Sequence, residues 1–93
     1  MHGDAKLKVP GGKLVAVKLS YSDKIEEIQI LGDFFIHPEE SLADIERCLI
    51  STDAKASQDE IERKIDLVVR ARGIEMIGIS PGAIAQVMKM AIK

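Results

Sequence analysis

Aromatic residues, cysteines and long apolar runs are all scarce in this sequence of 93 residues. It has no tryptophan, one tyrosine and two phenylalanines, so its hydrophobic residues are mainly aliphatic. The single cysteine, Cys48, cannot form an internal disulfide, which agrees with a reducing compartment. No apolar run approaches the roughly 20 residues that span a bilayer, and the opening Met1-His2-Gly3-Asp4 is too polar to begin a signal peptide. We therefore expect a cytoplasmic protein with no membrane partner.

Blocks of one charge sign are also absent. The 13 Lys and Arg residues are interspersed with 15 Asp and Glu residues, and the formal net charge is −2. This pattern lacks the basic surface that is typical of nucleic-acid binding, so we expect no nucleic-acid partner. No internal repeat, low-complexity tract or linker divides the chain. We expect one globular domain, residues 1–93, compact from about residue 5 and large enough to bury a core without disulfides.

Residue types that carry catalysis or bind metals are few. Of the two histidines, His2 lies in an N-terminal segment that we expect to fray, and His37 precedes Pro38 in a turn. Both are expected to have surface or structural roles. A metal site needs three or four clustered ligands, and a nucleophile needs a base within reach. We therefore expect no metal site, no bound cofactor and no catalytic residue in this chain.

Alternating apolar residues predict three strands in the first third of the sequence. Residues 6–9 alternate, and residues 10–12, Pro-Gly-Gly, are typical of a tight turn. A second strand is predicted over residues 13–21, and a turn at residues 22–23 leads to a third strand over residues 25–31. The side chains expected to face inward are those of Val15, Val17, Leu19, Tyr21, Ile28 and Ile30. The pattern predicts an antiparallel meander.

Helix signals dominate the rest of the sequence. Pro38 suits a first helical position, Ser57 begins a capping box, and Gly73 is a natural C-cap residue. Ser80 begins a third helix, whereas residues 74–79 fit either a short strand or an extended connection. The residues expected to face inward are Leu42, Ile45, Leu49, Ile61, Ile65, Val68, Val69, Ile84, Val87, Met88 and Ala91. We predict an α+β fold in which about three helices pack against the meander.

The segment Gly32-Asp33-Phe34-Phe35 places both phenylalanines at the end of the third predicted strand. Adjacent residues at a strand end point to opposite sides. We therefore predict that one phenylalanine enters the core and that the other is exposed for contact with a partner.

Two other segments have alternative interpretations. Pro10-Gly11-Gly12-Lys13 lacks the Gly-x-x-x-x-Gly-Lys-Ser/Thr spacing of a phosphate loop, so we favour a hairpin turn. Lys13 pointing toward an anionic ligand held by another protein is the alternative. Cys48 is predicted to pack as a small buried hydrophobe, and the alternative is a sulfur acceptor with an exposed, activated thiol.

The order of these segments resembles the C-terminal accessory domain of lipoate-protein ligases. The resemblance covers nearly the whole chain, and Gly-Asp-Phe-Phe is its most specific element. Two departures are Ile36-His37-Pro38, where we expect small residues, and the pair Ile45-Glu46 in place of Leu-Glu. The matching segments are Pro10-Gly11-Gly12-Lys13, Gly32-Asp33-Phe34-Phe35, Leu42 with Ile45-Glu46, the capped second helix, and Ile77-Gly78-Ile79-Ser80.

The resemblance implies a function as well as a fold. The fold is the α+β sandwich shared with iron-sulfur scaffold and sulfur-acceptor proteins, although one cysteine excludes the scaffold function. Because the large catalytic domain is missing, the chain looks like the small, non-catalytic subunit of a two-subunit ligase of the archaeal type. Lipoate, ATP and Mg²⁺ are then expected on the large catalytic subunit, where lipoate is activated to lipoyl-AMP before transfer to lipoyl-acceptor proteins, which this chain would meet only indirectly.

The residues expected to contact the large subunit are Lys13, Asp33, Phe34 and Phe35. A sulfur-transfer acceptor that uses Cys48 is the rival function, and a small interaction module unrelated to lipoate is a third. The sequence leaves open whether lipoate or octanoate is preferred.

Overall fold

A computed structural model describes residues 1–9, 11 and 13–92 of the chain. Three strands in the first third of the chain form an antiparallel sheet in the order β1-β2-β3, which confirms the predicted meander. The hairpin between β1 and β2 is closed by the Val9 N–H, which donates to the Lys13 carbonyl oxygen at 2.8 Å. The turn predicted at Pro10 and Gly12 lies outside the described residues. The three strands are β1 (His2–Lys8), β2 (Leu14–Tyr21) and β3 (Ile25–Gly32).

The predicted start of the first strand is wrong. β1 begins at His2 rather than at residue 6, and its N-terminal end is not frayed. Gly3 explains why this end of the strand is packed. It lies so close to the Ala91 carbonyl oxygen, at the end of the last helix, that a Cβ atom on residue 3 would overlap this oxygen. The chain is therefore packed from its first residues onward, because only glycine allows β1 to approach that helix so closely.

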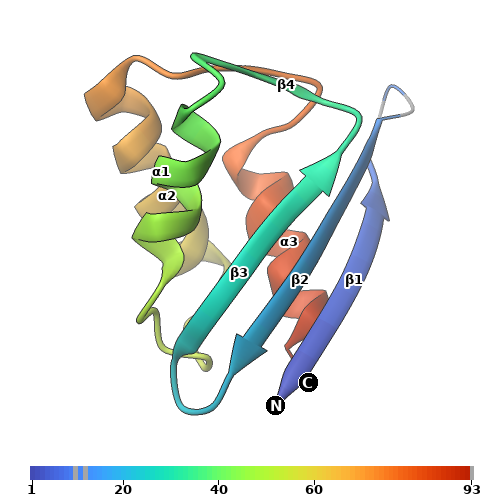
Figure 1. Cartoon of the computed structure of the whole chain (residues 1–93), viewed down its shortest axis with the longest axis vertical. Helices are drawn as coiled ribbons and strands as arrows, with labels where there is room; N and C mark the ends of the chain where they lie inside the picture. Colours follow the sequence, from blue (N-terminus) through green and yellow to red (C-terminus); the bar gives the residue numbers. More distant parts are fainter. Residues whose placement is uncertain (10, 12, 93) are drawn as a thin grey trace.

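Three helices cover one face of the sheet (Figure 1). The capping signals place two of them, because the Ser57 hydroxyl accepts from the Glu60 N–H and the Ser80 hydroxyl accepts from the Ala83 N–H, both at 3.1 Å. Gly73 ends the second helix in the left-handed conformation that favours glycine. The helices are α1 (Ser41–Leu49), α2 (Gln58–Arg72) and α3 (Pro81–Ala91).

The first helix begins later than predicted. Pro38 lies in a turn, and α1 starts three residues further on, at Ser41. The Ser41 N–H donates to the Pro38 carbonyl oxygen at 3.0 Å, which is a turn contact rather than a helical one. Ser41 itself is buried against the core, so packing rather than local propensity sets the first residue of the helix.

A second, two-stranded sheet was not predicted in full. Strand β4 (Phe35–His37) pairs antiparallel with β5 (Glu75–Ile77). The strand alternative for residues 74–79 is therefore correct, whereas β4 was missed. Its three residues are too few to produce an alternating pattern in the sequence.

The core lies between the main sheet and the helices. The inward faces predicted for β2 and for the helices are largely confirmed, because Val15, Val17, Ile45 and Ile84 are fully buried. None of the helices in the described part of the chain is long and apolar enough to cross a membrane.

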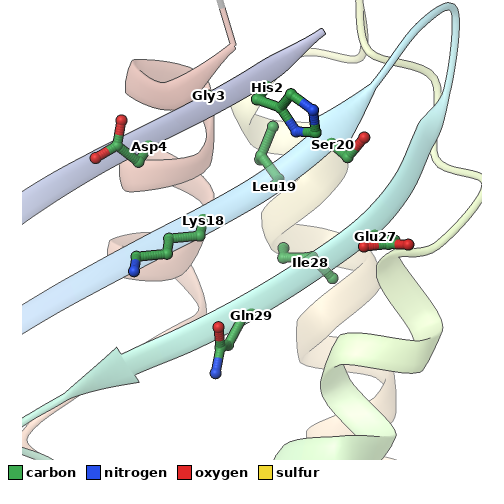
Figure 2. Close-up of a pocket in the computed structure, with 9 residues that line it drawn as sticks. All are labelled: His2, Gly3, Asp4, Lys18, Leu19, Ser20, Glu27, Ile28 and Gln29. Atoms are coloured by element: carbon green, nitrogen blue, oxygen red, sulfur yellow. The ribbon is translucent and has the colours of Figure 1, made fainter.

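None of the described helices packs against the opposite face of the sheet. Figure 2 shows its polar side chains in rows that cross the three strands. Asp4, Lys18 and Gln29 form one row, and the neighbouring row contains Ser20. This face is open to solvent.

Candidate functional site

The predicted interface residues come together at one end of the main sheet, where β3 leads into β4. Lys13, Asp33, Phe34 and Phe35 line one open hollow. Gly11 and Gly32 complete its lining. Lys13 and Asp33 are 20 positions apart in sequence, so strand pairing is what brings them together.

Gly32 determines how the chain leaves β3. It has φ = 151°, and a Cβ atom there would overlap the Leu14 carbonyl oxygen and lie 3.0 Å from the Phe34 ring. The next residue, Asp33, donates its backbone N–H to the same Leu14 oxygen at 3.0 Å. Glycine is required here because both the backbone conformation and the close approach exclude a side chain.

The two phenylalanines are divided between core and solvent, as expected for adjacent residues. Phe34 is half-buried and packs against the core, whereas the side chain of Phe35 is 69% exposed. Phe35 is therefore the phenylalanine that can contact another molecule.

Ile77 lies beside Phe35 and was not predicted as a site residue. The two residues are direct partners in the β4–β5 register, and the Ile77 side chain is 53% exposed. Direct partners on one face of an antiparallel pair have Cβ atoms about 5 Å apart. Phe35 and Ile77 thus form an exposed pair, which we call the apolar patch. The next pair on the same face, His37 and Glu75, is also exposed.

A sequence signal for Ile77 existed but was incomplete. Alternation within a strand over residues 75–77 puts Glu75 and Ile77 on the same face, so a charged first residue indicates an exposed isoleucine. That argument requires the strand assignment, and only the pairing with β4 establishes it.

Lys13 is positioned by a distant loop. A Cβ atom on Gly78, which follows β5 and has φ = 83°, would lie 3.1 Å from Lys13 Cγ. The aliphatic part of the Lys13 side chain therefore rests against the Gly78 backbone.

Glu46, the acidic member of the Ile45-Glu46 pair, has a structural role. Its Oε2 accepts a hydrogen bond from the Ile30 backbone N–H at 2.8 Å. Because β3 is an edge strand, this N–H has no strand partner on that side. The carboxylate satisfies it and ties α1 to the sheet.

Cys48 lies on α1, half-buried, in a hollow between α1 and α2. Burial raises the pKa of the Cys48 thiol, and the charge of Lys64 offsets this increase only in part. The arginines that line the same hollow, Arg47 and Arg72, both pair with Asp44, at 3.6 and 3.5 Å. These surroundings favour the neutral thiol over the nucleophilic thiolate.

We expect Cys48→Ala to lower the free energy of unfolding by about 1 kcal/mol or less, because it removes one half-buried sulfur atom. In the unsubstituted chain, the burial that raises the thiol pKa should make alkylation at pH 8 at least about tenfold slower in the folded protein than in the urea-unfolded protein. Rapid alkylation of the folded protein would contradict this prediction and favour the sulfur-acceptor function.

The hollow in Figure 2 contains residue types that occur in hydrolase triads, since His2, Ser20 and Glu27 form one row across the strands. Its geometry does not fit that chemistry. The Ser20 hydroxyl donates to Glu26 at 3.4 Å, and Glu26 also accepts from Ser22 at 3.2 Å. A nucleophile has to donate to its base.

Within the described residues, no group of three or more His, Cys, Asp or Glu side chains could hold a metal ion.

Comparison with solved structures shows what this chain resembles. No protein-family model and no curated protein match the chain. Among solved structures, it matches a chain from an archaeal lipoylation system of Thermoplasma acidophilum, described as a bi-partite lipoate protein ligase and its E2 lipoyl domain. The match has 26% sequence identity and a TM-score of 0.78, and it covers 95% of this chain and 94% of that chain. The resemblance predicted from the sequence is therefore confirmed: over nearly its whole length, this chain is similar to a component of an archaeal lipoate protein ligase system.

Proposed function

We propose that this chain is the non-catalytic accessory subunit of a two-subunit lipoate-protein ligase. Residues 1–93 would act as one accessory domain in the cytoplasm, and a separate large subunit would carry the active site. The observation that supports this most strongly is the near-complete, reciprocal coverage between this chain and a chain of similar length from a bi-partite ligase system. A chain that matched only a part of a larger enzyme would cover a small share of it.

The accessory subunit would act on the first half of the reaction, in which lipoate and ATP form lipoyl-AMP and release pyrophosphate. Lipoyl-AMP is a mixed anhydride that water hydrolyses, so its formation benefits from a site that closes over it. A subunit that docks against the large subunit can order the loops that hold the phosphates and exclude water. Lipoate, ATP and Mg²⁺ would bind to the large subunit, and the acceptor protein would receive the lipoyl group there.

The surface around the hollow is our proposed contact with the large subunit. It combines the apolar patch of Phe35 and Ile77 with Lys13 and Asp33. Interface contacts that contribute most to affinity are commonly exposed aromatic residues surrounded by polar groups. The chain has three aromatic residues in total. One of them, Phe35, is 69% exposed and therefore contributes little to the core.

The rival function, sulfur transfer through Cys48, has weaker support. It requires an accessible thiolate, whereas Cys48 is half-buried and its pKa is raised by burial. We therefore place the functional surface at β4 and β5 and not at α1.

The test is reconstitution of the activation step. The chain is mixed with a candidate large subunit, lipoate, ATP and Mg²⁺, and pyrophosphate release is measured for the mixture and for each subunit alone. We expect release from the mixture only, and calorimetry should detect no micromolar binding of ATP or lipoate to this chain alone. Replacing lipoate by octanoate in the same assay determines the substrate preference. Full activity of the large subunit alone, or tight binding of ATP to this chain, would contradict the proposal.

A further inference from the structure

Within the part of the chain that the structure describes, strand β1 has one edge that no other strand covers. It pairs with β2 on one side only, and Figure 1 shows no element along its other edge. Tyr21 and the Met1 backbone exchange two hydrogen bonds, at 2.7 and 2.8 Å, and Val9 donates to Lys13 at the other end. Along an antiparallel strand, the backbone N–H and C=O groups of successive residues point to opposite edges. Because Met1 and Val9 both bond toward β2, the odd-numbered residues of β1 do so as well. The even-numbered residues therefore direct their N–H and C=O groups toward the free edge.

The even-numbered residues of β1 also carry its charges. Asp4, Lys6 and Lys8 are exposed on the face of the sheet opposite the helices. Charged side chains on an edge strand usually prevent unspecific pairing with other strands. The order of these charges also permits specific pairing, because Asp4 and Lys6 exchange places when the strand is reversed about Ala5.

A second copy of β1 placed antiparallel to the first about Ala5 satisfies both the backbone and the charges. Asp4 of each copy then lies directly opposite Lys6 of the other, so two opposite-charge pairs form. Even-numbered residues face even-numbered residues, so the outward backbone groups can exchange hydrogen bonds. Ala5, small and half-buried, lies on the axis, where the two backbones approach most closely.

The neighbouring registers are less favourable. A shift of two residues in one direction puts Asp4 opposite its own copy. A shift in the other direction pairs Asp4 with Lys8 but puts Lys6 opposite its own copy on the axis. Like charges directly opposite each other destabilise a strand pair. A shift of one residue removes the match between backbone donors and acceptors. Of these registers with matched backbone groups, the one centred on Ala5 has no like charges directly opposite each other, so the charges favour it.

We propose that two copies of this chain associate through the free edges of β1, antiparallel and about a two-fold axis at Ala5. The two three-stranded sheets then form one continuous sheet. An axis perpendicular to the sheet keeps both helical layers on the same face. Helix α3 packs against β2 as well as β1, so it lies beneath the sheet and leaves the edge accessible (Figure 1).

This association does not depend on the proposed function. The apolar patch belongs to β4 and β5, whereas the pairing edge belongs to β1. A dimer would therefore present two apolar patches, each free to bind one large subunit.

Charge reversal tests the register with little risk to folding, because Asp4 and Lys6 are exposed. Sedimentation equilibrium of the full chain should show a reversible dimer. Asp4→Lys and Lys6→Asp should each weaken dimerisation at least about tenfold, since each variant replaces two attractive pairs by two repulsive pairs. An equimolar mixture of the two variants should recover the association, because every pair in the mixed dimer is again attractive.

The double variant Asp4→Lys/Lys6→Asp provides a second check, since it exchanges the charges and should dimerise like the original chain. Amide hydrogen exchange of Asp4 and Lys6 should slow as the protein concentration rises. An unsubstituted chain that stays monomeric up to its solubility limit would overturn the proposal. So would a mixture of the two single variants that remains monomeric, or a dimer that Phe35→Ala dissociates and the charge reversals do not.

Discussion

Phe35→Ala is expected to leave the stability of the free chain nearly unchanged and to remove most of the activity that depends on the large subunit. The side chain is 69% exposed, so its loss should change the free energy of unfolding by no more than about 0.5 kcal/mol. As an interface anchor it should contribute about 2 kcal/mol, which corresponds to an affinity loss of roughly 30-fold. Melting temperature of the free chain and pyrophosphate release at limiting large subunit measure the two effects separately.

Two matched variants make this prediction specific. Leu67→Ala removes a side chain that is 65% exposed on α2, away from the proposed surface, and should change neither measurement. Ile77→Ala should reproduce the effect of Phe35→Ala, because the two side chains form one patch. If Phe35→Ala and Leu67→Ala release pyrophosphate at the same rate, the proposed surface does not contact the large subunit.

Phe34→Ala should behave differently from its neighbour. Phe34 packs against the core, so its truncation should lower the melting temperature of the free chain. Activity should be retained at temperatures where the variant is folded. Early melting of the Phe35 variant together with full activity would instead mean that both phenylalanines serve only the core.

Gly32→Ala should have the largest effect on stability. The new Cβ atom would overlap the Leu14 carbonyl oxygen, and the alanine backbone would have to adopt a φ near 151°. The combined strain should cost roughly 3 kcal/mol, which corresponds to a decrease of about 15 °C in melting temperature for a domain of this size. Because relief of the overlap must move the chain that leads to Asp33 and Phe34, partner-dependent activity should also fall.

Gly11→Ala is the control for the Gly32 substitution. Gly11 also has a positive φ, 98°, but a Cβ atom there would have nothing within 4 Å. Its substitution should therefore cost only the backbone conformational term, about 1 kcal/mol. Equal melting temperatures for the two variants would show that the close approach at Gly32 is relieved without cost.

Those parts of the fold that depend on neighbours in sequence were predictable. The alternation through Val15, Val17 and Leu19 determined which face of β2 is buried, and Ser57 and Ser80 marked where two helices begin. In each case the determining contacts lie within a few residues, so the local pattern contains the information. The division of Phe34 and Phe35 between core and solvent was also predictable, but the sequence did not indicate which of the two is buried.

The contacts between segments that are far apart in sequence could be seen only in the tertiary structure. The pairing of Phe35 with Ile77, the contact of Lys13 with Gly78 and the hydrogen bond from Ile30 to Glu46 each connect residues that are far apart in sequence. Three-residue strands have no detectable period, and a glutamate that accepts from a backbone N–H looks in sequence like any surface glutamate. The sequence by itself determined the three strands of the main sheet, the three helices and most of their apolar faces, although not every first residue. The position of the apolar patch depends on long-range pairing, because a short strand is defined by its partner and not by its own residues.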